Sequence, residues 1–371
     1  MTVELGAFLR TTLPLGLDNL ADYDSGRYHS LWLPDHFVSF WPDSIWTPEF
    51  TDLAVASPSP HRHLDALAVA GTVAALTQNT PISTLVVDTV RRHPVMLAQT
   101  ALTLSHLSKG RFILGLGSGE VENVAPYGFD FTKPVSRMIE AVKVIKLLWE
   151  SEGPVDFQGE FFHLEHARLD TEPYEGKFPP IYMAAGGPRT LKLLGQHGDG
   201  WFPGAIRSPE HYAEQLGIIH QAADAAGRDP QAITPIFMCP AFIGDEAELD
   251  ELLSAPLVKS YVLQIDAANL RSVGYEHPMG PEWKGIHDLD PAKLTRGVVL
   301  DMLAKTTPEM LKAWVPHGPP AKVAAYYKQY VDAGARVIKI LDYGGMAGIN
   351  YAARSAQRTR EAEDALLALC A

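Results

Sequence analysis

The residues best placed to do chemistry follow an apolar run that begins at Arg111. The run RFILGLG leads into Gly117-Ser118-Gly119 and then into the carboxylate of Glu120. Glycines adopt backbone conformations closed to other residues, so a ligand can approach the chain closely there. The spacing differs from the GxGxxG of a dinucleotide-binding turn, because Glu120 stands where the third glycine would be. The stretch is therefore either a ligand-binding turn with a carboxylate at its exit or a purely structural turn.

A histidine, His36, follows a second apolar run and is preceded by Asp35. An imidazole gains and loses a proton near neutral pH, which suits an acid or a base in catalysis. Neighbouring side chains on an extended strand point to opposite sides, so a group other than Asp35 must orient the imidazole. Glu120 would donate a proton if burial kept it protonated, or it would cap the helix that follows. Together, His36 and Glu120 are candidates for a pair flanking a cofactor, with structural roles as the alternative.

A third turn, AAGGPR at 184–189, joins a predicted strand to a helix that starts at a proline. Backbone N–H groups at such a helix start suit a phosphate or another anion, although the pattern also fits a plain turn. The basic residues expected near these strand ends, with a solvated surface charge as the alternative for each, are Arg91, Arg92, Lys133, Arg137 and Arg189. The aromatic candidates for stacking on a ring or lining a pocket are Trp41, Trp46, Tyr127 and Trp201, with core packing favoured for Trp201.

The sequence does not favour a metal site or a serine nucleophile. His61 and His63 resemble a metal pair, but they follow a Ser/Pro loop and have no acidic partner at convincing spacing, so no metal is expected. Gly117-Ser118-Gly119 has the wrong frame for the GxSxG turn of a serine hydrolase.

Composition narrows the class of protein. A hydrophobic content of 46% can supply a sizeable core, and a formal net charge of -13 argues against nucleic acid as a partner. No run of apolar residues is long enough to predict a membrane span, and the first residues lack the features of a signal peptide. Cys239 and Cys370 lie far apart and suggest no disulfide framework. We expect a cytoplasmic protein.

Eight short apolar runs alternate with helical patterns, which predicts parallel strands joined by right-handed crossovers. A doubly wound sheet alternates in the same way, but eight strands within 371 residues favour an α/β fold of the (β/α)8 TIM-barrel type with insertions. The predicted strands are 3–9, 30–33, 82–87, 112–116, 181–184, 200–202, 234–241 and 337–340. The predicted helices include 64–76, 95–107, 136–150, 190–196, 209–226 and 351–369.

Reactive groups of such a barrel lie beyond the C-terminal strand ends, where loops converge on one mouth. This rule places Asp35, His36, Asp88, Glu120, Gly186, Gly187 and Asp342 on a common face. Three stretches interrupt the alternation, at 41–60, 153–180 and 244–316. We expect a single domain over 1–371, in which the stretch at about 244–316 is an insertion that covers the pocket. The terminal helix is expected outside the barrel, as a candidate interface for a homodimer.

Four segments together resemble the bacterial luciferase-like superfamily, and within it the branch that uses the deazaflavin coenzyme F420. They are LWLPDHF at 31–37, VRRHPVMLAQTALTLSHLSKGRFILGLGSGEVEN at 90–123, PPIYMAAGGPRTLKLLGQHGDGWF at 179–202 and AYYKQYVDAGARVIKIL at 325–341. The second and third segments are the specific ones. The resemblance covers nearly the whole chain and implies a luciferase-like TIM barrel with the deazaflavin across its mouth.

The resemblance also implies which residues border the cofactor. The ring would lie near His36, and the phosphate-bearing tail would run outward to basic residues such as Arg189. The family often has a non-proline cis peptide bond at the third strand end, which would fall near Thr84 and Leu85. The residues that match the family's cofactor positions are Asp35, His36, Thr84, Leu85, Val86, Gly117, Ser118, Gly119, Glu120, Asn123, Ala185, Gly186 and Gly187.

Within this branch, two groups of enzymes are similar to the chain. Sugar-phosphate dehydrogenases share the Asp-His-Phe and Gly-x-Gly-Glu patterns, but their tryptophan after the histidine has no clear match in FVSFW at 37–41. Phthiodiolone and phenolphthiodiolone dimycocerosates ketoreductases resemble the chain more closely, at VVDTVRRHP (86–94), PYGFDFTKPVSR (126–137) and EHPMG (276–280). The resemblance therefore implies redox chemistry between a ketone and a secondary alcohol, with a small or lipid-like carbonyl compound as substrate.

The resulting hypothesis is hydride transfer between the deazaflavin C5 and a ketone. His36 would give the carbonyl oxygen a proton, and Glu120 would manage the proton of the cofactor ring. The alternatives are an FMN-dependent monooxygenase of the same superfamily, a sugar-phosphate dehydrogenase, and a deazaflavin-binding protein without catalytic activity.

Overall fold

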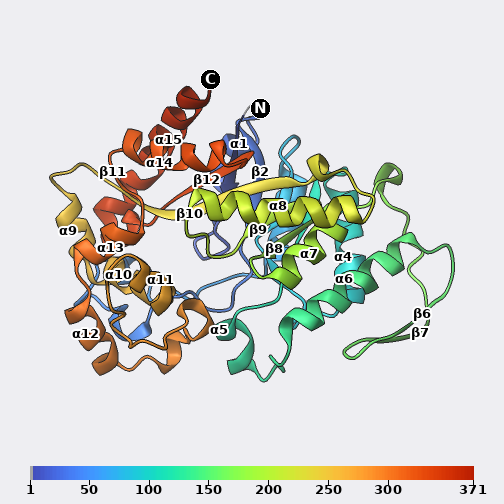
Figure 1. Cartoon of the computed structure of the whole chain (residues 1–371), viewed down its shortest axis with the longest axis horizontal. Helices are drawn as coiled ribbons and strands as arrows, with labels where there is room; N and C mark the ends of the chain where they lie inside the picture. The colour runs from blue at the N-terminus through green and yellow to red at the C-terminus, as the bar shows by residue number, and fades with distance from the viewer. Residues whose placement is uncertain (1–2) are drawn as a thin grey trace.

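The computed structural model describes residues 3–371, and its centre is a closed barrel of eight parallel strands (Figure 1). β1 closes the ring by pairing with both β2 and β12. The barrel strands are β1 (Glu4–Phe8), β2 (Tyr28–Leu33), β3 (Ile82–Thr84), β5 (Phe112–Gly117), β8 (Ile181–Ala185), β9 (Gly200–Pro203), β10 (Thr234–Ile243) and β12 (Val337–Asp342). Two short strands extend the sheet, β4 (Val87–Asp88) on β5 and β11 (His317–Gly318) on β10. The predicted TIM barrel is confirmed.

The barrel strands are continuous apolar runs because both of their faces are buried, one against the interior and one against helices. In β2, Leu31, Trp32 and Leu33 are all fully buried. The interior is filled by large rings, and those of Trp32 and Phe202 meet edge to face with centroids 5.2 Å apart. Gly6 on β1 makes room for this packing, since a Cβ there would lie 2.3 Å from the Trp32 ring. Side chains thus fill the barrel interior, so a ligand site is expected at the end of the barrel and not inside it.

Helices surround the barrel and cover the outer face of the sheet (Figure 1). Prolines begin several of them, at a position where the missing N–H costs no hydrogen bond. The terminal helix packs against its predecessor and β12 on the outside, as predicted. The outer helices are α3 (Ala66–Leu76), α4 (Pro94–Leu107), α6 (Pro134–Glu150), α7 (Pro188–His197), α8 (Pro209–Ala225), α14 (Pro320–Asp332) and α15 (Ile349–Cys370). Among residues 3–371, no helix combines the length and apolar character needed to cross a membrane.

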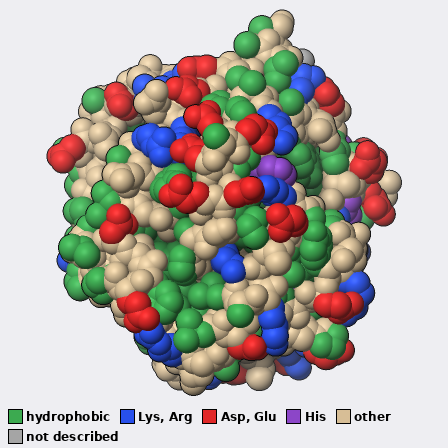
Figure 2. Space-filling view, turned by 90° about the vertical axis from the view of Figure 1, so that its left-hand side faces the viewer, with side chains coloured by type: hydrophobic (Ala, Val, Ile, Leu, Met, Phe, Trp, Pro, Cys, Tyr) green, Lys and Arg blue, Asp and Glu red, His purple; other side chains and the backbone are tan. Residues whose placement is uncertain are grey.

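Between β10 and β11 the chain forms a group of short helices on one side of the barrel, drawn in orange in Figure 1. These helices share a second hydrophobic core, to which Ile45 and Phe242 from outside the insertion also contribute. Seen from this side, acidic and basic side chains alternate over the surface (Figure 2). The α-helices of the insertion are α9 (Leu249–Ser254), α10 (Pro256–Lys259), α11 (Ala267–Ser272), α12 (Arg296–Lys305) and α13 (Pro308–Trp314).

The predicted interruption at 153–180 contains an antiparallel hairpin, β6 (Val155–Gln158) and β7 (His163–Ala167). In Figure 1 the hairpin extends from the end of the molecule opposite the insertion. It therefore leaves the barrel mouth to the insertion and to the loops that follow β2, β3 and β5.

Candidate active site

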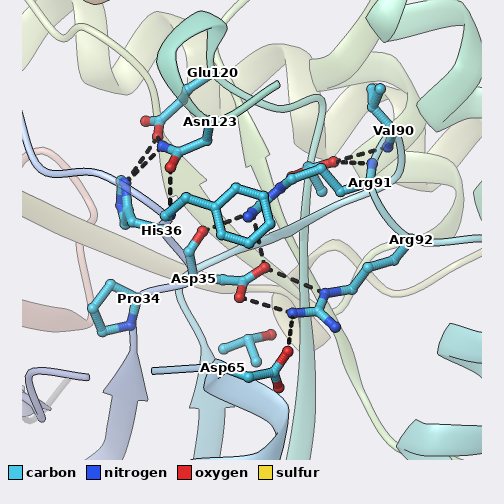
Figure 3. Close-up of polar contacts among 12 residues, drawn as sticks. Pro34, Asp35, His36, Asp65, Val90, Arg91, Arg92, Glu120 and Asn123 are labelled. Carbon is cyan, nitrogen blue, oxygen red and sulfur yellow. Dashed lines mark hydrogen bonds and ion pairs between the residues drawn. The ribbon is translucent and has the colours of Figure 1, made fainter. Parts of the chain in front are cut away.

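The ends of β2 and β5, the two strands on either side of β3, bring the predicted catalytic residues together. Asp35 and His36 follow β2, and Glu120 follows β5 and precedes the short helix α5 (Val121–Val124), which carries Asn123. His36, Glu120 and Asn123 point toward one another (Figure 3). His36 Nδ1 lies 3.5 Å from Glu120 Oε2. The geometry thus places the predicted histidine and carboxylate at one point of the barrel rim.

Asn123 is the group that orients the imidazole. Its side-chain oxygen accepts hydrogen bonds from the backbone N–H groups of Phe37, at 2.6 Å, and Val38, at 3.1 Å. Because the oxygen is used in this way, the amide nitrogen must face His36, and it lies 2.9 Å from Nδ1. In neutral His36, Nδ1 is therefore the acceptor and the proton is on Nε2. The Nε2–H group is left to serve a bound ligand.

A second carboxyl, that of Glu122, lies beside Asn123, and the sequence analysis did not select it. Glu122 Oε1 accepts a hydrogen bond from Asn123 Nδ2 at 2.9 Å. The residue is only 1% exposed, whereas the Glu120 side chain is 35% exposed. Burial, followed by the charge of Glu120, raises the pKa of Glu122 to about 9. The burial that would make Glu120 a proton donor is thus found at Glu122, while the Glu120 side chain is partly exposed.

The ligand atoms of His36, Glu120 and Glu122 all lie within 4.8 Å of one another, a spacing that a metal ion also favours. However, Asn123 Nδ2 lies among them, at 2.9 Å from His36 Nδ1, 3.5 Å from Glu120 Oε2 and 2.9 Å from Glu122 Oε1. The Asn123 amide therefore already lies between these atoms and donates to His36 Nδ1 and Glu122 Oε1, two of the three atoms that a cation would need as ligands.

Asp35 is the centre of a buried ion-pair network below the site (Figure 3). Arg91 donates to Asp35 Oδ2 at 2.9 Å and also pairs with Asp88, while Arg92 donates to Asp35 Oδ1 at 3.0 Å and to Asp65 at 2.8 Å. Arg91 and Arg92 were candidates for binding an anionic tail, but their guanidinium groups are committed to these carboxylates. The network fixes the loop that carries His36. Contact of Asp35 with a cofactor stays a prediction.

The floor of the mouth is apolar and lies where the third strand ends. The peptide bond between Leu85 and Val86 is cis, at the place that the family resemblance implied. Leu85, Val86 and Ala184 are half-buried and pack on the rings of the barrel interior. Gly117 lets the Val86 side chain reach across β5, since a Cβ at 117 would lie 2.6 Å from Val86 Cγ2. Together these residues form an apolar, partly exposed surface.

In the turn after β8, the backbone N–H groups and the basic side chains that could bind an anion already have partners within the protein. The backbone N–H groups of Gly186 and Gly187 both point at the Thr190 hydroxyl, at 3.3 and 3.2 Å. Arg189 is exposed and donates to Ser136 at 2.9 Å. The other basic candidates here are also paired, Lys133 with Glu160 and Arg137 with Asp130. Binding of an anion at this turn requires that Arg189 or these pairs rearrange.

His61 and His63 contact the loop that follows β2. Ser39 donates its backbone N–H to His61 Nδ1 at 3.0 Å, and its hydroxyl lies 2.9 Å from His63 Nε2. Burial is the main reason why the pKa of His63 falls to about 3, so this imidazole is neutral at physiological pH. The His63 ring lies 5.5 Å from the His36 ring and packs beside it. The pair thus supports the loop that holds His36.

Comparison with known proteins agrees with this geometry. Residues 24–337 match the family model described as luciferase-like monooxygenase. The chain belongs to this family. It is 34% identical over 317 residues to a phthiodiolone/phenolphthiodiolone dimycocerosates ketoreductase of Mycobacterium bovis, covering 84% of this chain and 83% of that protein. It is 30% identical to an F420-dependent glucose-6-phosphate dehydrogenase of Kineococcus radiotolerans, covering 79% of this chain and 80% of that protein.

The fold is also shared with a solved structure. An F420-dependent secondary alcohol dehydrogenase, in complex with an F420-acetone adduct, superposes with a TM-score of 0.72 at 21% identity and covers 99% of both chains. These matches confirm the family and the barrel predicted from the sequence, and the chain is an oxidoreductase-type enzyme.

Proposed function

We propose that this protein is an F420-dependent oxidoreductase that transfers a hydride between the deazaflavin C5 and a ketone or secondary alcohol. The observation that carries the proposal is the orientation of His36, whose Nδ1 faces the Asn123 amide so that Nε2 is left for a carbonyl oxygen. The related ketoreductase and the F420-dependent dehydrogenase support the same chemistry.

The residues present fit a planar tricyclic cofactor. Leu85, Val86 and Ala184 offer a partly exposed apolar surface for its rings, and the polar groups of His36 and Asn123 lie at the same barrel mouth. The glycine at 119 has a φ of +92°, a conformation that a side chain would disfavour, and it keeps the rim open beside Glu120. When bound there, the deazaflavin would supply the hydride.

The protein's own part is to move protons and to position the carbonyl group. His36 Nε2–H polarises the carbonyl oxygen and protonates it as the hydride reaches the carbon. Glu120 Oε2 lies 3.5 Å from His36 Nδ1, close enough to pass a proton to this nitrogen as the Nε2 proton leaves, so that the imidazole stays neutral. In the reverse direction the same groups remove the proton of a secondary alcohol.

An apolar or lipid-like ketone suits the surroundings of His36 better than a sugar phosphate does. The Phe40 ring lies 5.5 Å from the His36 ring, and Trp41 and Tyr343 contact each other with centroids 5.8 Å apart. Tyr343 in turn meets Tyr261 of the insertion at 5.5 Å. We propose that the insertion and barrel form one domain, since Phe242 at the end of β10 lies in the insertion's core.

Titration of the protein with coenzyme F420 and with FMN, followed by anaerobic turnover, tests this function. We expect tight binding of F420, and oxidation of the reduced coenzyme only when a ketone is present. Preference for FMN with consumption of oxygen would instead identify a monooxygenase of the family. Binding without any turnover would indicate a carrier. Homodimer formation and a cytoplasmic location also stay predictions, and light scattering of the purified protein tests the first of them.

A further inference from the structure

The carboxyl of Glu122 is an unusual buried group. One oxygen accepts a hydrogen bond from Asn123 at 2.9 Å, but the other, Oε2, has no hydrogen-bond partner among the described residues. The residue is 1% exposed. An ionised carboxylate with an unsatisfied oxygen is costly at such a site, whereas a protonated acid has an O–H that can donate. The geometry therefore favours a neutral Glu122.

The natural acceptor for that O–H is Glu120. Both carboxyls lie against the same amide of Asn123, and their ligand atoms are within 4.8 Å of each other. Two adjacent carboxyls hold one proton more readily than two negative charges. Because Glu122 is buried and Glu120 is partly exposed, the proton resides mainly on Glu122 and the negative charge on Glu120.

Glu122 borders a small cavity. With a volume of about 70 Å³, it has room for water. Its lining is mainly apolar, but it includes His61, whose Nε2 lies 3.0 Å from the exposed carboxylate of Asp43. The other lining residues are Val38, Pro126, Tyr127, Asp290, Pro291 and Ala292. Glu122 thus contacts both the site of His36 and Glu120 and a cavity that reaches the exposed Asp43.

We propose that Glu122 is a proton relay that connects the site of His36 to solvent through this cavity. The proposal rests on the proposed function and adds the route by which the catalytic histidine is reprotonated. The titratable groups along the route are His36, Glu120, Glu122, His61, Asp43, Tyr127 and Asp290.

The steps balance in protons and electrons. The carbonyl carbon gains a hydride with its two electrons from the reduced deazaflavin, and the carbonyl oxygen gains the proton of His36 Nε2. As the Nε2 proton leaves, the proton shared by Glu120 and Glu122 moves to His36 Nδ1, so the imidazole stays neutral, and cavity water protonates Glu122 again. After the alcohol leaves, Nε2 takes up one proton, Nδ1 returns its own through Glu120, and the ring proton that an oxidised deazaflavin would lose makes the whole reaction neutral in protons. In alcohol oxidation each transfer runs backward.

Two variants of Glu122 separate a relay from a structural role. Glu122→Gln keeps the size and the acceptor for Asn123, but it cannot pass a proton. We expect hydride transfer in a single turnover to stay within about twofold of wild type. Steady-state kcat should fall on the order of tenfold, with a larger solvent isotope effect. Glu122→Ala should show the same loss and regain activity with added formic acid, which the vacated space admits. The control Glu165→Gln changes an exposed carboxyl on β7.

The infrared band of a protonated carboxylic acid provides a readout that needs no activity. We expect it at pH 7 in the wild type and not in Glu122→Gln. Absence of the band in the wild type, or equal losses in single-turnover and steady-state rates, would overturn the relay. A wild type that shows the band but oxidises no reduced deazaflavin with any ketone would overturn the proposed function. In that case Glu122 would still hold a proton beside Glu120, but it would not supply that proton to a ketone reduction.

Discussion

The protonated state of Glu122 predicts how the stability of the protein depends on pH. Burial and the neighbouring Glu120 raise its pKa from 4.5 to about 9 in the folded chain, while the unfolded chain keeps the ordinary value. Between these two values the folded state binds one more proton than the unfolded state. The contribution of this group to stability is therefore fully present below pH 4.5 and is lost as the pH rises toward 9.

The size of the effect follows from the same shift. One pKa unit corresponds to about 1.4 kcal/mol, so ionisation of Glu122 in the unfolded chain costs the fold about 3 kcal/mol at pH 7. Glu122→Gln imitates the neutral acid and removes this cost. We expect the variant to be more stable than wild type at pH 7 and above, and to approach wild type near pH 5.

Urea unfolding of both proteins at a series of pH values measures this difference. All other titrating groups are common to the two chains, so the difference between the curves isolates Glu122. The expected slope of the wild type relative to the variant is about -1.4 kcal/mol per pH unit between pH 5 and 8. The assignment of a neutral Glu122 would be refuted if the two proteins showed the same dependence of unfolding free energy on pH. It would also be refuted if the variant lost stability relative to wild type between pH 5 and pH 8.

Three further predictions concern the residues around it. His36→Ala should retain F420 binding but lose most turnover, on the order of 100-fold or more, measured as kcat beside the cofactor Kd; unchanged turnover would remove its role as proton donor. Asn123→Asp should move the His36 proton from Nε2 to Nδ1, because an acceptor then faces Nδ1; 15N NMR of the imidazole reports the tautomer, and an unaltered spectrum would contradict the orientation argument. Arg91→Met should destabilise the fold by about 3–5 kcal/mol, because it removes the ion-pair partner of the buried Asp88 and one of the two arginine partners of the buried Asp35; a loss below 1 kcal/mol in urea unfolding would show that the network is not needed.

The barrel could be predicted because its strands have a recognisable sequence pattern. Strands buried on both faces appear as short continuous apolar runs, such as Leu31–Leu33 and Phe112–Leu116, and long outer helices separate them. The helices of the insertion were not predicted individually. Helices of four to six residues, such as α9 and α10, contain too few turns to show a helical period, and their burial depends on a core shared with distant residues.

The site could be predicted only where its residues follow strand ends, and not where their positions depend on tertiary contacts. His36 and Glu120 follow strand ends, so the barrel rule places them together. Glu122 was missed because an acidic residue in the first turn of a helix usually complements the helix dipole in solvent. Its burial arises from Asn123 and from the cavity-lining loop near Val38, which are tertiary contacts. The ion pairs of Arg91 and Arg92 could not be predicted for the same reason, because their partner Asp35 lies 56 residues before Arg91 in the sequence.

The transfer of deuterium from C5-labelled, reduced coenzyme F420 to a ketone tests the central claim most directly. The enzyme would be incubated without oxygen with the labelled coenzyme and a panel of apolar ketones, and the alcohol products would be analysed by mass spectrometry. Hydride transfer predicts one deuterium at the carbinol carbon of the product and none at oxygen after exchange with water. Alcohol without label, or coenzyme oxidation that needs oxygen and no ketone, would contradict the proposed function.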